Sequence, residues 1–223
     1  MLRPTYSINV VEVKMKKKII LVRHGRQNSK ACNVDVPLSL EGRRQAELLG
    51  KYLETSSFDV LYSSDLIRAR ETAEIVNTHL ELKHVIKKEL REIDWGNLTG
   101  LSEPELKTRL VHIEDRFLCK EDFCFPEGEC GEDVFTRCRP VIDEMIESDN
   151  ERFLVITHGG TIRALVCGLL GLPMNFRLAF GRVLENTSMT ELVYSTDNKR
   201  FTLERFNDYS HLLSEPSLLK KNW

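Results

Sequence analysis

The sequence has no apolar run long enough to span a membrane, and it has no stretch rich in glycine, serine and proline that would link two domains. The segment before Met15 lacks the apolar core of a secretion signal, because Asn9, Glu12 and Lys14 interrupt it. These absences argue against a membrane protein and predict a single domain in the cytoplasm.

The chain also lacks an excess of either charge, since its 223 residues carry a formal net charge of -2. A protein that binds nucleic acid through its overall charge is strongly basic, so we expect neither a nucleic-acid nor a membrane partner. Any anion site must therefore be built locally. The composition gives no information on the oligomeric state.

Paired C-x-x-C spacings are missing as well. Four of the 6 cysteines lie close together in the sequence, but without the short pairs that hold structural zinc: Cys119, Cys124, Cys130 and Cys138. We expect reduced, partly buried thiols and no metal.

What the sequence does contain is an apolar run that ends on chemically active residues, KKIILVRHG at Lys17–Gly25. Ile19 to Val22 has no alternating polar residue, which predicts a strand buried on both faces. Arg23 and His24 then fall where parallel sheets bind ligands, beyond the strand ends. Gly25 is expected to turn the backbone and to keep a Cβ away from the imidazole.

The same pattern recurs at Phe153–Thr157, which ends in His158, Gly159 and Gly160 and leads into an apolar helix to Leu170. The carboxyl ends of two parallel strands can meet at one crevice. Either polar end alone could be structural; the repetition predicts one site that contains both histidines.

Between these strands, Ser39 predicts the N-cap of a helix to about Glu54, with an apolar stripe of Leu40, Ala46, Leu49 and Leu53. A short strand at Phe58–Tyr62 follows, with Ser63, Ser64 and Asp65 as candidate caps of the next helix. Arg68 lies in the first turn of that helix, where it would strengthen an anion site.

The other predicted elements are a loop at Glu89–Gly100, a helix from the Ser102/Glu105 capping box to about Phe117, a loop at Cys119–Gly131, a helix at Val134–Ile146, strands at Ser188–Tyr194 and Phe201–Phe206, and a polar tail at Asn207–Trp223. Residues 1–14 are expected to extend from the fold, or to add an edge strand at Ile8–Val13. Residues 15–223 would then form one domain with a helical cap insertion at about 100–131.

Taken in order, the motifs resemble the histidine phosphatase superfamily, which has the phosphoglycerate mutase-like fold. The matching motifs are LVRHG at Leu21–Gly25, LSLEGRRQA at Leu38–Ala46, SSDLIRARETA at Ser63–Ala73, LREIDWGNLTG at Leu90–Gly100, PEGEC at Pro126–Cys130 and THGG at Thr157–Gly160. The resemblance implies a three-layer α/β/α sandwich around a largely parallel sheet, with no metal and no cofactor.

Carried onto this chain, the resemblance implies that His24 is the phosphoryl-accepting nucleophile and that Arg23, Arg68 and His158 hold the phosphate oxygens. It implies Glu92 as the proton donor, in preference to Asp94 or Glu89. Gln27, Asn28 and Gly159 are expected to add phosphate contacts. Lys30 stands where the family has an asparagine, so Asn28 or Asn33 could substitute; Cys130 replaces a serine.

These residue types suit phosphoryl transfer, which needs an in-line nucleophile and donors around the phosphate oxygens. Two nearby arginines would also keep an imidazole neutral and able to attack. His79, His84, His112 and His211 lack a strand-end context and are expected to be surface or core residues.

We therefore expect a metal-independent phosphomonoesterase that acts on a small phosphorylated metabolite through a phosphohistidine on His24. A phosphoglycerate mutase is one alternative, although the loop from His24 to Leu38 is short and lacks the tryptophan-bearing segment of the mutases. A non-catalytic module that binds phosphate is another.

Overall fold

A computed structural model describes residues 16–102, 104–109, 121–180 and 184–220. The expected extension at 1–14, with the alternative strand at Ile8–Val13, and most of the helix predicted to reach Phe117 lie outside these residues. Residues 104–109 are helical, and the backbone N–H of Ser102 donates to the Glu105 carboxylate at 2.8 Å. The Glu105 half of the predicted capping box is therefore present, and the Ser102 hydroxyl donates to the same carboxylate.

Six strands form one sheet in the order β3-β2-β4-β1-β5-β6. Their bounds are β1 Lys16–Arg23, β2 Val60–Ser63, β3 His84–Ile86, β4 Arg152–Thr157, β5 Met189–Ser195 and β6 Arg200–Asp208. The pairs β1 with β4, β2 with β4 and β2 with β3 are parallel, whereas β5 pairs antiparallel with both β1 and β6. Among these strands only β5 runs against the rest, so the sheet is mixed but largely parallel.

Strand β1 explains why the sheet has a core on each face. Ile19 and Leu21 pack into one apolar cluster and Ile20 and Val22 into the other, because successive side chains of a strand point to opposite faces. The predicted strand with both faces buried is confirmed.

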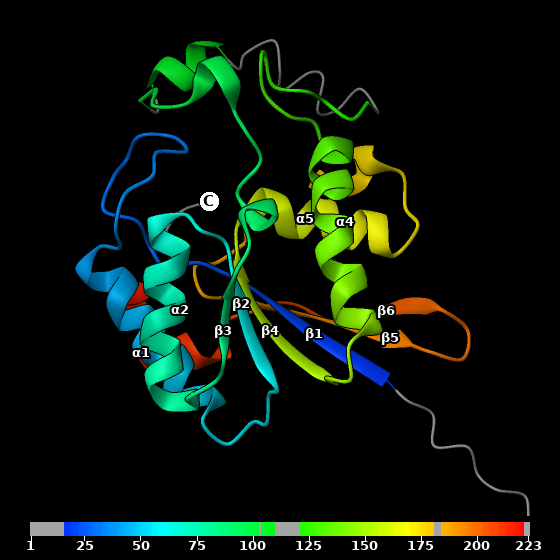
Figure 1. The fold of residues 1–223 in the computed structure, drawn as a ribbon. Coiled ribbons are helices and arrows are strands. Elements are labelled where there is room, and N and C mark those ends of the chain that lie inside the picture. The colour runs from blue at the N-terminus through cyan, green and yellow to red at the C-terminus, as the bar shows by residue number, and fades with distance from the viewer. Residues whose placement is uncertain (1–15, 103, 110–120, 181–183, 221–223) are drawn as a thin grey trace, which may run out of the picture.

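Two pairs of helices cover the two faces, as Figure 1 shows. Helices α1 (Leu40–Leu53) and α2 (Ile67–Leu80) pack together on one side, and α4 (Gly131–Glu147) and α5 (Gly159–Leu169) on the other. The expected three-layer α/β/α sandwich is confirmed. No helix in the described ranges is both long and apolar enough to cross a membrane.

Short elements occupy the edge of the sheet where β1, β2 and β4 end. Figure 1 shows η2 (Gly96–Leu98) and the helical residues 104–109 above this edge, and the loop after β1 beside them. The other 3-10 helices are η1 (Lys88–Leu90), η3 (Met174–Leu178), η4 (Ser210–Leu212) and η5 (Pro216–Leu218).

The helix start before Arg68 differs from the prediction. Ser63 is the last residue of β2, and α2 begins at Ile67 with Leu66 as N-cap and no side-chain cap bond from it. The free N–H of Ile67 instead donates to Asp35 Oδ1 at 2.8 Å. The loop after β1 therefore caps α2, which local sequence could not reveal.

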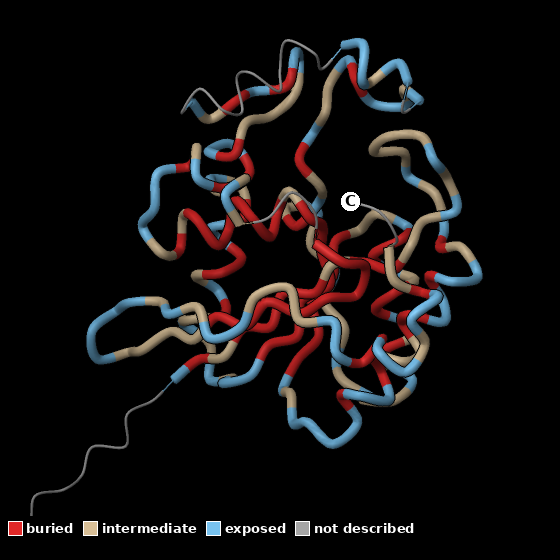
Figure 2. The backbone as a smooth tube through the Cα atoms, turned by 180° about the vertical axis from the view of Figure 1, so that it is seen from behind, coloured by how far each residue is buried: buried red, intermediate tan, exposed pale blue. Residues whose placement is uncertain are grey.

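One further expectation was wrong. Leu40 is 80% exposed, because it is the first residue of α1 and lies off the buried stripe. The polar tail also packs onto the fold, with Leu212 and Leu218 buried and the Gln45 amide donating to Leu218 O at 2.9 Å. Figure 2 shows the buried centre of the molecule in red and its exposed loops in pale blue.

Candidate active site

His24 follows directly after β1 and is held there by its own backbone. Its N–H donates to Thr157 O at the end of β4, at 2.9 Å, and its carbonyl accepts from the Asn186 amide at 2.9 Å. The side chain is buried, with 4% exposed. Because β1 and β4 are parallel, His24 and His158 emerge at the same edge of the sheet, as the sequence predicted.

The hydrogen bonds of His24 define its tautomer. Nδ1 lies 2.7 Å from Gly25 O, which can only accept, so Nδ1 carries the proton. Nε2 accepts from Arg68 Nε at 3.2 Å. The ring is therefore neutral, with its lone pair on Nε2, which is the form that can attack phosphorus.

Arg68 lies in the first turn of α2 and is 1% exposed. Besides its bond to His24, its guanidinium donates to Val34 O at 2.9 Å and to Asn33 Oδ1 at 3.4 Å. The loop after β1 thus fixes the plane of the guanidinium against the His24 ring. Of the two asparagines proposed to replace the family's phosphate contact, Asn33 is the one that reaches Arg68.

His158 and Arg23 complete the buried part of the site. The rings of His24 and His158 lie 5.0 Å apart between centroids. Among the described residues, neither ring nitrogen of His158 nor Nε of Arg23 has a hydrogen-bond partner, although all three are buried. Buried groups of this kind are normally satisfied, so these point to a ligand that they are arranged to bind.

Burial and like charge both disfavour protons here. The pKa of His24 lies well below its usual value, first because the ring is buried and then because Arg68 and Arg23 are close. Burial and Arg68 likewise lower the pKa of His158. Burial also lowers the pKa of Arg23 and of Arg68, and Glu92 opposes this in both. Such desolvated cations favour a bound anion.

Glu92 reaches this cluster from the loop after η1. Its Oε1 accepts from the backbone N–H groups of Ile93, Gly160 and Thr161 at 3.0, 2.9 and 3.3 Å. Two of these donors belong to the first turn of α5, a position that attracts a carboxylate. All three bonds use Oε1, so Oε2 stays available to a substrate.

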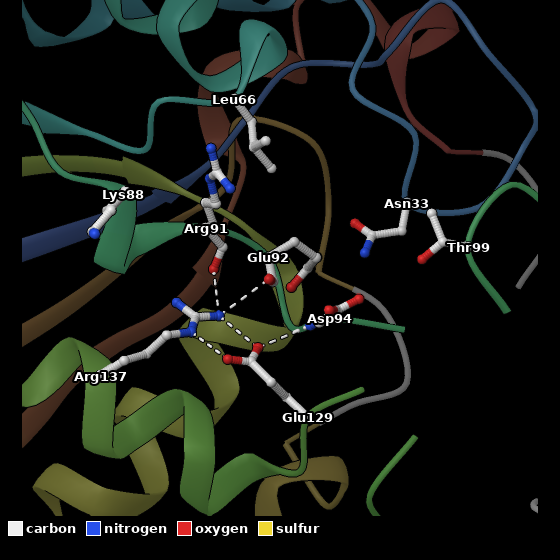
Figure 3. Close-up of a pocket in the computed structure, with 9 residues that line it drawn as sticks. All are labelled: Asn33, Leu66, Lys88, Arg91, Glu92, Asp94, Thr99, Glu129 and Arg137. Carbon is white, nitrogen blue, oxygen red and sulfur yellow. Dashed lines mark hydrogen bonds and ion pairs between the residues drawn. The ribbon is translucent and has the colours of Figure 1, made fainter. Parts of the chain in front are cut away.

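A pocket of about 360 Å³ adjoins Glu92, and Figure 3 shows its lining. Leu66 is the one apolar residue of this lining. The other eight are polar or charged: Asn33, Lys88, Arg91, Glu92, Asp94, Thr99, Glu129 and Arg137. Asn33 belongs both to this lining and to the Arg68 contacts, so the pocket opens beside the catalytic candidates. Asp94 also lines it and bonds Gly96 N at 2.9 Å.

Of the remaining predicted phosphate contacts, Gln27 and Asn28 lie in the loop after β1, and Gly159 lies beside Arg23. The Gln27 amide donates to Ser29 O and Ala31 O, at 3.2 and 3.0 Å, and so braces its own loop. Asn28 is exposed. Gly159 is the first residue of α5, where an added Cβ would lie 3.7 Å from Arg23 Nε. The roles of these three residues stay predictions.

Gly25 is needed for a reason other than the predicted one. A Cβ at Gly25 would lie 2.6 Å from Gly42 O, and one at Gly42 would lie 2.1 Å from Arg26 O. The two glycines therefore let the loop after β1 approach α1, and the predicted clearance beside the imidazole stays a prediction.

Two buried cations were missed from the sequence. Burial lowers the pKa of Arg163 to about 10, and Arg23 adds to the effect. Burial and Arg23 also lower the pKa of Lys220, to about 7, although it lies in the tail. The i,i+4 spacing of Arg163 from Gly159 on α5 was an available signal. Nothing in the sequence indicated Lys220.

The histidines expected outside the site are outside it where the structure describes them. His84 Nε2 lies 2.7 Å from Ser63 Oγ, and His211 Nε2 lies 2.9 Å from Thr187 Oγ1. His79 is half-buried on α2. His112 lies outside the described residues.

Comparison with known proteins points to the same chemistry. An uncharacterized phosphatase of Bacillus subtilis is 28% identical over 200 residues, which cover 87% of this chain and 96% of that one. A 2,3-bisphosphoglycerate-dependent phosphoglycerate mutase of Azorhizobium caulinodans is 32% identical over 169 residues, or 68% of this chain and 81% of that one.

Solved structures agree with the fold. The mycobacterial glucosyl-3-phosphoglycerate phosphatase with inorganic phosphate has a TM-score of 0.80 at 26% identity, covering 87% of this chain and 99% of that one. The sequence profile of the histidine phosphatase superfamily (branch 1) matches residues 19–209, which contain His24, Arg68, Glu92 and His158. The chain is therefore a phosphatase-type enzyme with the phosphoglycerate mutase-like fold, and it belongs to branch 1 of the histidine phosphatase superfamily.

Proposed function

We propose that the protein hydrolyses a small phosphorylated metabolite, without a metal ion, through a phosphohistidine formed on His24. The observation that carries this proposal is a buried, neutral His24 whose Nε2 lone pair lies among cations, with His158 and Arg23 Nε lacking partners in the described structure. A phosphate dianion would satisfy those groups.

In the first step, His24 Nε2 attacks phosphorus and a P–N bond forms while the bond to the leaving oxygen breaks. Arg68, Arg23 and His158 bind the non-bridging oxygens, and Arg68 turns its Nε–H from His24 to the substrate. Glu92, which carries a proton in the substrate complex, gives that proton to the leaving oxygen through Oε2 and becomes a carboxylate. Electrostatic stabilisation by such fixed donors is commonly the largest catalytic contribution.

In the second step, water attacks the phosphohistidine. Glu92, now a carboxylate, takes a proton from that water as the new P–O bond forms and the P–N bond breaks. Inorganic phosphate leaves, and His24 regains its lone pair. Protons and charge balance over the two steps, so guanidinium groups and imidazole suffice and no metal is required.

The pocket supports a small, polar alcohol as the leaving group. Its lining carries both positive and negative side chains, and its volume of about 360 Å³ suits a metabolite better than a peptide. Related proteins are named as a phosphoserine phosphatase of Hydrogenobacter thermophilus and as the glucosyl-3-phosphoglycerate phosphatase above. Phosphorylated hydroxy acids and amino acids are therefore the first substrates to test.

The test is to trap the intermediate. Rapid quenching with radiolabelled substrate should leave an acid-labile phosphoramidate on wild-type protein and on His84→Gln, a matched histidine outside the site. His24→Ala should carry none. Label that persists in His24→Ala, or that maps to another residue, contradicts the proposal.

Metal independence needs its own measurement. Excess chelator should leave kcat unchanged, whereas vanadate should inhibit by occupying the cluster of Arg23, Arg68 and His158. A rate that collapses in chelator and returns with a divalent ion would place the chemistry at a metal.

A phosphoglycerate mutase is the second candidate, because curated relatives of that name match this chain. A mutase would need a bisphosphate to phosphorylate His24 and would return the phosphoryl group to a second hydroxyl. Phosphate release from a monophosphate without any bisphosphate favours the hydrolase. A non-catalytic module would bind the substrate without turnover.

We also propose a cytoplasmic location and a small-molecule partner in place of nucleic acid or membrane. The balanced charge of the chain supports the small-molecule partner. Fractionation of cells that express the protein would test the location.

A further inference from the structure

Four of the five cysteines in the described residues fall into two groups, and Cys32 belongs to neither. Cys138 and Cys167 are buried in the core, and the Cys138 thiol donates to Glu89 O at 2.9 Å. Cys124 and Cys130 are not buried, and with Asp133 they bring two sulfurs and a carboxylate oxygen within 4.8 Å of one another. The spacing of these three residues in the sequence does not indicate that they lie together.

A tight turn brings the two thiols together. Phe125 N donates to Glu129 O at 3.1 Å, and Gly128 N donates to Phe125 O at 2.9 Å. Cys124 and Cys130 immediately flank this turn, so they face each other across its base, as residues do beside a hydrogen-bonded pair in a hairpin.

Asp133 is held beside them by the start of α4. Its Oδ2 accepts from Cys130 N at 2.9 Å and from the Cys130 thiol at 3.0 Å. Both bonds use Oδ2, so Oδ1 can bind a cation while the helix cap persists. The carboxylate is therefore in place before any ligand arrives.

We propose that Cys124, Cys130 and Asp133 bind one zinc ion, with water as the fourth ligand. Thiolates and a carboxylate are ligands that zinc accepts in tetrahedral geometry, whereas magnesium and calcium need oxygen donors only. On binding, each thiol releases its proton to solvent. The two thiolates, the carboxylate and the ion together carry one net negative charge, which the amino end of α4 stabilises.

This zinc takes no part in phosphoryl transfer. Its effect would pass through Glu129, the neighbour of Cys130, which accepts from Asp94 N at 2.9 Å and from Arg137 Nε at 2.7 Å in the pocket wall (Figure 3). The ion would close the base of the turn and so hold that wall. Zinc binding at this site can be tested without knowing which substrate the enzyme hydrolyses.

The test uses untagged, full-length protein, reduced and freed of metal with a chelator. Titration with zinc should show one equivalent bound per chain and a rise in Tm, and cobalt in its place should give a thiolate-to-metal absorption band. Cys124→Ser, Cys130→Ser and Asp133→Asn should each weaken zinc binding more than about 10²-fold, because even partners outside the ligand set contribute 10–100-fold. Cys32→Ser, which keeps both thiols of the site, should bind like wild type.

Three results would overturn the proposal. Substoichiometric binding, or binding that survives Cys130→Ser, would show only adventitious metal. A cobalt complex without a thiolate band would move the ion to oxygen ligands elsewhere. Loss of both thiols to a Cys124–Cys130 disulfide under mild peroxide, with no zinc bound by the reduced protein, would make the pair a redox site instead.

Discussion

At the scale of single residues, the bond from Arg68 to His24 holds the imidazole in place in the resting structure. Arg68 Nε donates to His24 Nε2, the nitrogen that attacks phosphorus in the proposed mechanism. A phosphate dianion is a stronger acceptor than a neutral imidazole, so in this mechanism a bound substrate draws the guanidinium away and frees the lone pair. His24 is thus neutral in the resting structure, and its lone pair becomes available only when substrate binds.

This arrangement makes Arg68→Lys a damaging change. An ammonium cannot bond His24, Val34 O and the substrate from one rigid plane, so kcat/KM should fall by about 10²–10³-fold. The control is Arg70→Lys on the same helix, an exposed arginine that bonds only Glu74 among the described residues. Equal activity of the Arg68→Lys and Arg70→Lys proteins would remove Arg68 from the phosphate site.

Glu92 can be separated from the rest of the site by the leaving group. An alkyl phosphate releases a strongly basic alkoxide that must be protonated. p-Nitrophenyl phosphate instead releases p-nitrophenolate, which is weakly basic and leaves without a proton. Glu92→Gln should therefore lose about 10²–10⁴-fold on the alkyl substrate and far less on the aryl one, in steady-state assays of both.

The matched control for this experiment is Asp94→Asn, because Asp94 lines the same pocket. We expect its two rates to change in parallel and only modestly. If Asp94→Asn loses activity on the alkyl substrate while Glu92→Gln keeps it, Asp94 is the proton donor. Equal losses on both substrates in Glu92→Gln would instead give Glu92 a positioning role.

At the scale of elements, the tail from Ser210 to Leu218 is part of the fold. Leu212 is fully buried, whereas its neighbour Leu213 is 58% exposed. Leu212→Ala should lower the free energy of unfolding by about 2–5 kcal/mol and Leu213→Ala by less than about 0.5, as measured by urea denaturation. Similar values for the two variants would show that the tail is detached in solution.

The elements that the sequence predicted best are those whose role depends on local pattern. The strands β1 and β4, the Ser39 cap of α1 and the start of the 104–109 helix follow from apolar runs and cap residues. The cap of α2 could not be predicted, because its acceptor is Asp35, more than thirty residues earlier in the chain. The buried tail was missed because its few apolar residues sit in a polar stretch.

At the scale of the whole molecule, buried neutral histidines make the fold sensitive to acid. Burial lowers the pKa of His211 from 6.5 to about 4, and burial followed by Arg68 holds the pKa of His24 and of His158 well below 6.5. The unfolded state therefore takes up protons first as the pH falls. Stability is fully present above the unfolded pKa of about 6.5 and is lost below it.

The free energy of unfolding should accordingly be lower at about pH 5 than at about pH 7.5, with His211 alone accounting for about 2 kcal/mol. Urea denaturation at both values would measure it. In His211→Gln, the decrease in the free energy of unfolding between the two pH values should be smaller by that amount. This comparison does not depend on the variant's absolute stability. An unchanged loss would mean that His211 is protonated in the folded protein.

Local sequence was enough to place both candidate histidines at one edge of the sheet. An apolar run buried on both faces must lie inside a sheet, and a polar side chain directly after it must emerge at the sheet's edge, so His24 and His158 were identifiable without coordinates. The motif order was specific enough to indicate the family. These inferences rest on short-range geometry, which a chain carries in its local pattern.

The other groups around that edge became known only once the folded chain was described. Arg163 and Lys220 join the cluster, Asn33 reaches Arg68, and Cys124 turns back onto Cys130, because separate segments pack against the same sheet edge or fold back on themselves. Such proximity depends on the path of the backbone between the segments. Residue spacing along the chain does not encode that path, so the electrostatics of the site and the thiol cluster emerge only once the elements are packed.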